Sequence, residues 1–291
     1  MRAALLMILA ALAAIAQDRQ PGQGVNFYST EKESALGASL AAEIMRQATP
    51  IDSQVVRDFV DAIGNRLAAQ MPGAPFPYAF TVIAGDSNPT HEPVAVPGGH
   101  VFVSAALILA AKDEAELAGM LAHAMVHISE RHSTRLATRA ELAGQSAIPL
   151  VFMGGWAGYG VRQANTAVVP QAMLTFQRAQ ETQADTLAIT ITSKAGFDPL
   201  ALVRYIGREQ AAAPGAVGTV FAVLPPTEMR VSAMQSAIQA LPQQAYTSLD
   251  SDEFGRIQTE VRRVMPLAER PELKRVPLVN DQKPSLKRGK A

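Results

Sequence analysis

Apolar residues recur every three or four positions in two windows that follow a polar stretch at residues 17–30. One window begins at Thr30 and the other at Asp52, and each predicts an amphipathic helix. Glu33, three residues after Thr30, completes a pattern that resembles a capping box, and Asp52 can cap the second helix. The polar stretch itself predicts a linker.

The pattern changes to that of strands after the second helix. Tyr78–Ala84 is rich in aromatic and β-branched residues, which favour a strand, and Val94–Val103 is a second region of this kind. Pro97-Gly98-Gly99 interrupts the second region. Because proline cannot donate to a sheet ladder, we expect Val94–Val103 to form an edge strand or a bulged hairpin.

The rest of the pattern is mostly helical. The strongest window is Asp113–His132, where Asp113 and Glu116 are placed to cap the N-terminus, and residues 133–142 can continue the same helix. Three later helices are predicted, and they span Gln171–Lys194, Pro199–Gln210 and Pro226–Leu241. We therefore expect an α+β fold that is mainly helical, with one small sheet.

The amino-acid composition argues against one class of protein and restricts the possible metal ligands. Lys and Arg together number 26, and so do Asp and Glu, so the formal net charge is zero. This balance argues against a nucleic-acid binder, which normally carries a basic surplus. The chain has no cysteine, so any metal must be held by histidine and carboxylate.

The two ends of the chain predict its location. Arg2 is followed by an apolar run, Ala3–Ala16, which is shorter than the ~20 residues needed to span a bilayer. Residues 1–16 are therefore interpreted as a cleaved signal peptide of an exported, periplasmic or extracellular protein, with an uncleaved anchor as the alternative. Residues 31–265 would form the folded domain. Residues 266–291 are basic and predict a disordered tail, either solvated or in peripheral contact with the cell envelope.

Candidate chemistry lies on two of the predicted helices. His123 and His127 are four residues apart, so they project from one helix face, and two neutral imidazoles at that spacing can bind one Zn²⁺. Glu181 and Asp185 share a face of a later helix in the same way. Glu181 could be a third zinc ligand, and Asp185 could accept the second ring N–H of a ligating histidine. Taken alone, each pair is better explained as ordinary polar positions on a helix.

A set of ordered segments supports the zinc interpretation. Four segments resemble those of the zinc metallopeptidases of family 48, which include the CAAX prenyl proteases and bacterial periplasmic protease-chaperones. They are Val96–Val103, Glu114–His123, Arg178–Asp185 and Ala195–Pro199, and a fifth segment, Pro225–Arg230, resembles the later Pro…Arg segment of the family.

The resemblance implies a gluzincin-like fold, in which residues 31–265 form a metallopeptidase-like domain. Its zinc helix would pack beside a small sheet whose edge strand, within Val94–Val103, binds the substrate backbone. The metal ligands that the resemblance implies are His123, His127 and Glu181. It also implies that Asp185 supports a ligand, that Arg230 is a candidate supporting residue, and that His132 makes a structural hydrogen bond.

The sequence departs from the family pattern at the catalytic position. The family motif is His-Glu-x-x-His, but this chain reads His123-Ala124-Met125-Val126-His127, so a methyl group replaces the general base. Losing positioned acid–base catalysis typically costs ~10²–10⁴-fold in rate. Leu224 stands where the family often has histidine, and Glu92 where it often has asparagine. Three departures favour natural divergence over a single engineered change.

Two functions follow from the resemblance. The first is a zinc metalloendopeptidase by descent, which would hydrolyse unfolded or misassembled extracytoplasmic polypeptides but is impaired by Ala124. The second is a non-catalytic pseudoprotease that binds such polypeptides as a chaperone or adaptor. Ala124→Glu is expected to raise peptidase activity by at least ~10²-fold, and Leu224→His to add to that gain.

Overall fold

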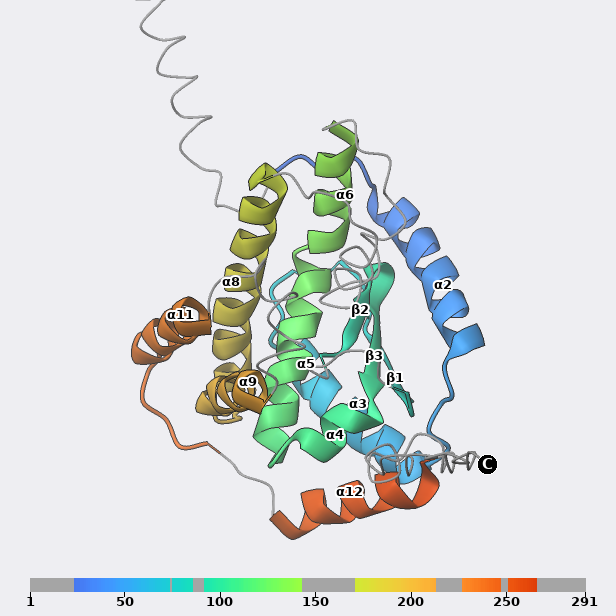
Figure 1. The fold of residues 1–291 in the computed structure, drawn as a ribbon, viewed down its shortest axis with the longest axis vertical. Coiled ribbons are helices and arrows are strands. Elements are labelled where there is room, and N and C mark those ends of the chain that lie inside the picture. Colours follow the sequence, from blue (N-terminus) through green and yellow to red (C-terminus); the bar gives the residue numbers. More distant parts are fainter. Residues whose placement is uncertain are drawn as a thin grey trace, which may run out of the picture.

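The computed structural model describes residues 24–73, 75–85, 92–142, 171–212, 227–246 and 251–265. These residues form a mainly helical molecule with a small mixed sheet beside its central helix (Figure 1). The α+β expectation is therefore confirmed. The expected signal peptide, the basic tail and Leu224 lie outside the described residues, as does half of the expected linker.

The first two helices are α2 (Thr30–Gln47) and α3 (Gln54–Ala68), close to where the apolar spacing predicts them. Their caps lie one residue away from the predicted positions. Ser29, not Thr30, is the N-cap of α2, and its side chain accepts a hydrogen bond from the Lys32 backbone N–H. Ser53, not Asp52, has the extended backbone of an N-cap before α3.

The sheet contains β1 (Ala79–Ile83), β2 (Val94–Val96) and β3 (His100–Ser104) in the order β1-β3-β2. β3 pairs in parallel with β1 and antiparallel with β2. Val94–Val103 thus forms a hairpin, but only its first half is an edge strand, and β3 lies in the centre of the sheet. A short 3-10 turn at Pro97–Gly99 reverses the chain, because Gly98 and Gly99 adopt φ values of 82° and 103°.

The central helix is α5 (Glu114–Ser129), which follows the short helix α4 (Ala105–Ala110). Asp113 caps α5 as predicted, and its side chain accepts a hydrogen bond of 2.8 Å from the Glu116 backbone N–H. The helix does not continue through residue 142. Arg131 has a positive φ of 55°, so the chain turns there and a separate helix, α6 (His132–Leu142), begins.

The remaining helices are α8 (Gln171–Lys194), α9 (Leu200–Ala212), α11 (Thr227–Gln239) and α12 (Ser251–Val264). In Figure 1, α8 runs alongside α5, α11 lies on the outer side of α8, and α12 crosses below α3 and α4. The sequence analysis predicted α8, α9 and α11 but missed α4 and α12. Their buried residues join those of α3, α5, α8 and the sheet in one large core.

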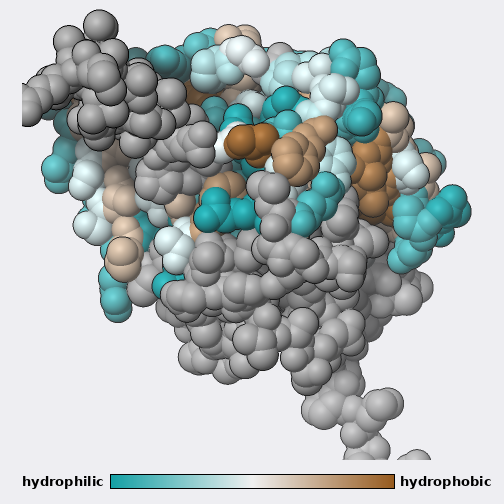
Figure 2. Space-filling model, turned by 90° about the horizontal axis from the view of Figure 1, so that it is seen from above, coloured by the Kyte–Doolittle hydropathy of each residue, from teal (hydrophilic) through white to brown (hydrophobic). Residues whose placement is uncertain are grey.

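The described surface is mixed in polarity. The face seen in Figure 2 presents hydrophilic side chains with small hydrophobic patches between them. Within the described ranges, we find no helix with an apolar stretch long enough to cross a bilayer.

Candidate metal centre

The two histidines of the central helix lie one turn apart and are buried. His123 and His127 expose 1% and 6% of their surface, and their Nε2 atoms are 3.1 Å apart. α5 is apolar along most of its length and is covered by α8, α9 and the sheet, so both imidazoles are fixed inside the molecule. Ala124, the residue between them that replaces the expected glutamate, is also buried.

Helix α8 brings the two predicted carboxylates to these histidines. Glu181 Oε2 lies 3.5 Å from His123 Nε2 and 3.7 Å from His127 Nε2. One turn further along α8, Asp185 Oδ1 lies 3.0 Å from His123 Nδ1. The contact with Asp185 favours a proton on His123 Nδ1, so that Nε2 is the nitrogen that would face a bound metal.

Helix α11 contributes Arg230, the candidate supporting residue. Its Nε and Nη2 donate hydrogen bonds of 2.6 and 2.7 Å to the two carboxylate oxygens of Asp185, and both side chains are buried. Burial would raise the pKa of Asp185, but the Arg230 guanidinium holds it below its usual value. Asp185 therefore stays ionised and can orient His123.

His127 is supported by a chain of side chains that the sequence analysis recognised only in part. Its Nδ1 lies 3.1 Å from Nδ1 of His132, and His132 Nε2 lies 3.2 Å from Gln183 Oε1. Gln183 Nε2 donates to Glu130 Oε2 at 3.0 Å, which orients the amide oxygen towards His132. If each N–H donates along this chain, His127 Nε2 is left without a proton, as a metal ligand requires.

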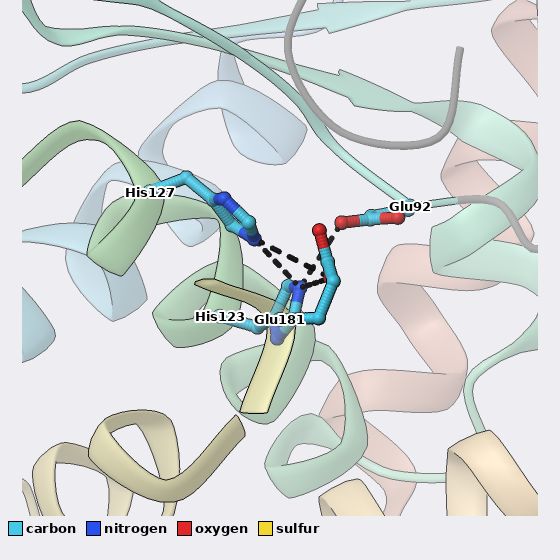
Figure 3. A group of neighbouring side chains, drawn as sticks. All are labelled: Glu92, His123, His127 and Glu181. Carbon is cyan, nitrogen blue, oxygen red and sulfur yellow. Dashed lines mark hydrogen bonds and ion pairs between the residues drawn. The ribbon is translucent and has the colours of Figure 1, made fainter. Parts of the chain in front are cut away.

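The structure adds a carboxylate that the sequence analysis noted only as a departure from the family. Glu92 precedes β2, exposes 3% of its surface, and places Oε1 3.1 Å from His123 Nε2. Figure 3 shows its carboxylate directed towards the two histidines and Glu181. No periodic pattern in the sequence identified Glu92, because it follows an irregular, turn-prone stretch. The approach of β2 to α5 is what brings it to the centre.

The electrostatics of the centre favour a positive charge. Burial alone would lower the pKa of His123, but three neighbouring carboxylates raise it well above its usual value. These carboxylates belong to Asp185, Glu181 and Glu92. Burial would raise the pKa of Glu181, yet His127 and His123 lower it well below its usual value. A buried site of this kind is suited to a cation.

The donor set fits a divalent metal. One ligand atom from each of Glu92, His123, His127 and Glu181 can be chosen so that all four lie within 4.8 Å of one another. Imidazole nitrogen and carboxylate oxygen are ligands that Zn²⁺ commonly takes in proteins. Glu92 Oε2 is buried and has no hydrogen-bond partner among the described residues, which leaves an acceptor available at the centre.

The fold and this centre define a metallopeptidase-like protein, and comparison with known proteins gives its family. The model of peptidase family M48 matches residues 56–238, so the chain belongs to that family. The matched range includes all four members of the cluster, together with Asp185 and Arg230.

Several curated relatives are proteases. The chain is 27% identical over 201 residues to the beta-barrel assembly-enhancing protease of Yersinia pestis. The aligned region covers 66% of this chain and 41% of the relative. It is 30% identical over 187 residues to a putative beta-barrel assembly-enhancing protease of Vibrio cholerae (61% and 38%). A protease HtpX homolog of Acidiphilium cryptum is 30% identical over 165 residues (50% and 53%). The chain thus matches only about two fifths of the length of the first two relatives.

Proposed function

We propose that this chain is an exported zinc metalloendopeptidase by descent, which acts on unfolded or misassembled extracytoplasmic polypeptides and hydrolyses them slowly or not at all. The observation that carries the proposal is the buried cluster of His123, His127 and Glu181, in which Ala124 replaces the general base. The names of the protease relatives support a role in the quality control of envelope proteins.

Some residues of the centre would bind the metal, and others would orient the residues that bind it. His123 and His127 would bind through Nε2 and Glu181 through its carboxylate. Asp185, held by Arg230, would fix the ring of His123, and His132 would fix the ring of His127. When bound, zinc would supply Lewis acidity and lower the pKa of a coordinated water towards ~7.

Ala124 limits what the centre can do with a bound polypeptide. A methyl group can neither take a proton from water nor deliver one to a leaving amine. The expected loss relative to a site with a glutamate is ~10²–10⁴-fold. Polypeptide binding does not need this group, because an extended chain can pair with the backbone of an edge strand. β2, the edge strand next to Glu92, is the strand that we propose for this pairing.

A second candidate function is that of a non-catalytic pseudoprotease, which retains polypeptides as a chaperone or adaptor. Two observations favour it. The general base is missing at position 124, and the carboxylate of Glu92 lies 3.1 Å from His123 Nε2. The two candidates share the zinc site and the polypeptide partner, and they differ in whether the polypeptide is cut.

The experiment that tests the proposal compares cleavage with retention. The chain without residues 1–16 is purified, its zinc content is measured by elemental analysis, and it is incubated with an unfolded casein-type substrate. About one zinc per chain and slow, chelator-sensitive cleavage support the peptidase, whereas retention of uncut substrate supports the pseudoprotease. His127→Ala is the control, and it should lose the metal. Absence of zinc from the unmodified chain would contradict both candidates.

Export is tested separately. Protein isolated from its native host should begin close to Gln17, because the apolar run that precedes this residue is too short to remain as a stable span. Mass spectrometry of the intact chain gives the mature N-terminus. Recovery of a chain that begins at Met1 in the membrane fraction would contradict export with cleavage.

A further inference from the structure

Glu92 approaches the centre from a different side than the other donors. His123 and His127 come from α5 and Glu181 from α8, whereas Glu92 lies just before β2 (Figure 3). Its backbone is positioned by the sheet, since Val94, two residues later, pairs with Phe102 of β3. Pro93 restricts the backbone between them. The backbone of Glu92 is therefore held next to the centre by the sheet.

The distances place Glu92 among ligand atoms. Four donors bonded tetrahedrally to zinc at ~2.0–2.1 Å lie about 3.3–3.4 Å from one another. Here, Glu92 Oε1 and His127 Nε2 are each 3.1 Å from His123 Nε2, and Glu181 Oε2 is 3.5 Å from the same nitrogen. Glu92 thus stands at a similar separation from His123 as the other two donors, and all four donor atoms lie within 4.8 Å of one another.

A carboxylate that acts as a general base occupies a different position. It hydrogen-bonds to a water in the fourth position of the metal, at about 2.6–3.2 Å from that water, and so lies outside the ring of donors. Glu92 Oε1 instead lies 3.1 Å from a ligand nitrogen, which is too close to leave a water between them. Its position corresponds to the fourth ligand rather than to a base beyond it.

The charge of the site is consistent with this position. Glu92 and Glu181 are both buried, and two carboxylates within a few ångströms of each other in a protein interior need a compensating positive charge. The charge of Asp185 is already balanced by Arg230 at 2.6 Å. One divalent cation would neutralise Glu92 and Glu181 together.

We propose that Glu92 is a fourth protein ligand of the zinc ion, which closes the coordination shell as two histidines and two glutamates. Closed shells of four protein ligands are typical of structural zinc sites, whereas catalytic sites keep one position open for water. The metal then stabilises the polypeptide-binding domain, and the chain acts as a pseudoprotease. This inference rests on the proposed function, because it requires zinc at His123, His127 and Glu181.

A closed shell also explains why an alanine is tolerated at position 124. Without a water in the fourth position, a base next to His123 has no proton to take. Ala124 and Glu92, which are separate departures in the sequence, then have a single physical explanation.

The first experiment uses the unmodified chain with Co²⁺ in place of zinc and acetohydroxamate as the added ligand. A closed shell is expected to give the visible absorption of four-coordinate Co²⁺, and acetohydroxamate should leave that spectrum unchanged. A spectral shift at millimolar acetohydroxamate would show an open position and overturn the inference. This measurement needs no variant of Glu92 to fold.

The second experiment compares Glu92→Gln with Glu33→Gln in competition for zinc with a chromogenic chelator. Glu33 is a matched control, since it is a buried carboxylate outside the cluster, bonded to Arg131 and Thr134. Glu92→Gln should weaken zinc binding by at least ~10²-fold and make the Co²⁺ spectrum respond to acetohydroxamate. Glu33→Gln should do neither. An unchanged zinc affinity in Glu92→Gln would overturn the inference.

The outcomes separate this inference from the proposed function. If the unmodified chain binds no zinc, the proposed function fails and Glu92 has no metal to bind. If it binds zinc through His127 but Glu92→Gln binds zinc equally well, only the fourth ligand fails. If the unmodified chain cleaves casein and Glu92→Gln keeps zinc but loses cleavage, Glu92 is a general base, which also overturns the closed shell.

Discussion

The metal centre has a helix side, formed by α5 and α8, and a strand side, formed by Glu92 before β2. The two sides differ in their suitability for binding a metal and for activating a water. On the helix side, His123 and His127 are supported by Asp185 and by His132, and these contacts suit the binding of a cation. On the strand side, Glu92 lies 3.1 Å from His123 Nε2, whereas on the helix side Ala124 stands where a residue would activate a water. The comparison indicates that holding a metal and activating a water are separable, and that this chain retains the means for the first.

The two sides also differ in how firmly their side chains are fixed. On the helix side, Asp185 accepts two hydrogen bonds from Arg230, so its orientation is determined by a buried bidentate pair. Glu92 Oε2, on the strand side, has no hydrogen-bond partner among the described residues, and the same is true of Glu181 Oε2 on the helix side. Glu92 should therefore depend on the metal for its position more than Asp185 does.

The largest expected effect comes from removing a helix-side donor. His127→Ala should reduce the zinc content to near zero, because it removes one of the two imidazole ligands of the site. Elemental analysis after gel filtration measures this change. His100→Ala, on β3, is the control and should keep the metal of the unmodified chain. Unchanged zinc in His127→Ala would show that the helix side is not the metal site.

The next largest effect is expected from a double variant that would restore an open, catalytic site. Ala124→Glu together with Glu92→Asn should cleave casein at least ~10²-fold faster than the unmodified chain, because the pair supplies a base and frees a coordination position. If the shell is closed, Ala124→Glu alone should gain much less than the ~10²-fold that the family resemblance alone leads us to expect. Initial rates measure both, with His127→Ala added to the pair as an inactive control. A full gain from Ala124→Glu alone would contradict the closed shell.

A smaller effect is expected from the support behind the helix side. Arg230→Met leaves the Asp185 carboxylate buried without its guanidinium partner, which should lower the free energy of unfolding by about 3–5 kcal/mol. It should also weaken zinc binding by ~10–100-fold, since Asp185 orients His123. Urea unfolding and chelator competition measure the two effects.

The control for Arg230→Met is Arg208→Met. Arg208 forms a similar bidentate pair with Glu116, with two hydrogen bonds of 2.7 Å, away from the cluster. Its loss should reduce stability but leave the zinc affinity of the folded protein unchanged. Equal losses of zinc affinity in the two variants would show that Arg230 acts only through stability.

The smallest effect concerns pH and lies far from the metal. Hydrogen bonds from Arg263 and Ser53 lower the pKa of Glu260, on α12, from 4.5 to about 2. A lowered pKa in the folded state means that the stabilisation is present above pH 4.5 and is lost as the pH falls towards 2. Glu260→Gln should therefore be slightly less stable than the unmodified chain at pH 7 and equally stable near pH 2. Urea unfolding at the two pH values checks this, and a difference that persists at pH 2 would contradict it.

Sequence spacing predicted the helix side well for a local reason. Residues four apart on a helix project from one face, so the pairs His123/His127 and Glu181/Asp185 could be identified before the helices were placed. The bounds of α8 agree with the prediction at both ends. The spacing did not determine that the two faces meet, and this depends on the packing of α8 against α5.

Other features escaped the sequence analysis for different reasons. α12 carries its buried residues Phe254, Ile257 and Val261 at helical spacing, so its pattern was readable although it was not predicted. The break between α5 and α6 depends on the positive φ of Arg131, a conformation that is uncommon for arginine and that no neighbouring glycine or proline signals.

The sequence by itself determined the helices that carry the histidines and carboxylates, the absence of a base at position 124, and the family resemblance. The tertiary structure decided the central position of β3, the bidentate pair between Arg230 and Asp185, and the arrival of Glu92 at the metal centre. The physical reason is the range of the interactions involved. Helical periodicity is set by neighbours three or four residues away, whereas Glu92 reaches His123 only because a strand and a helix distant in sequence pack into one core.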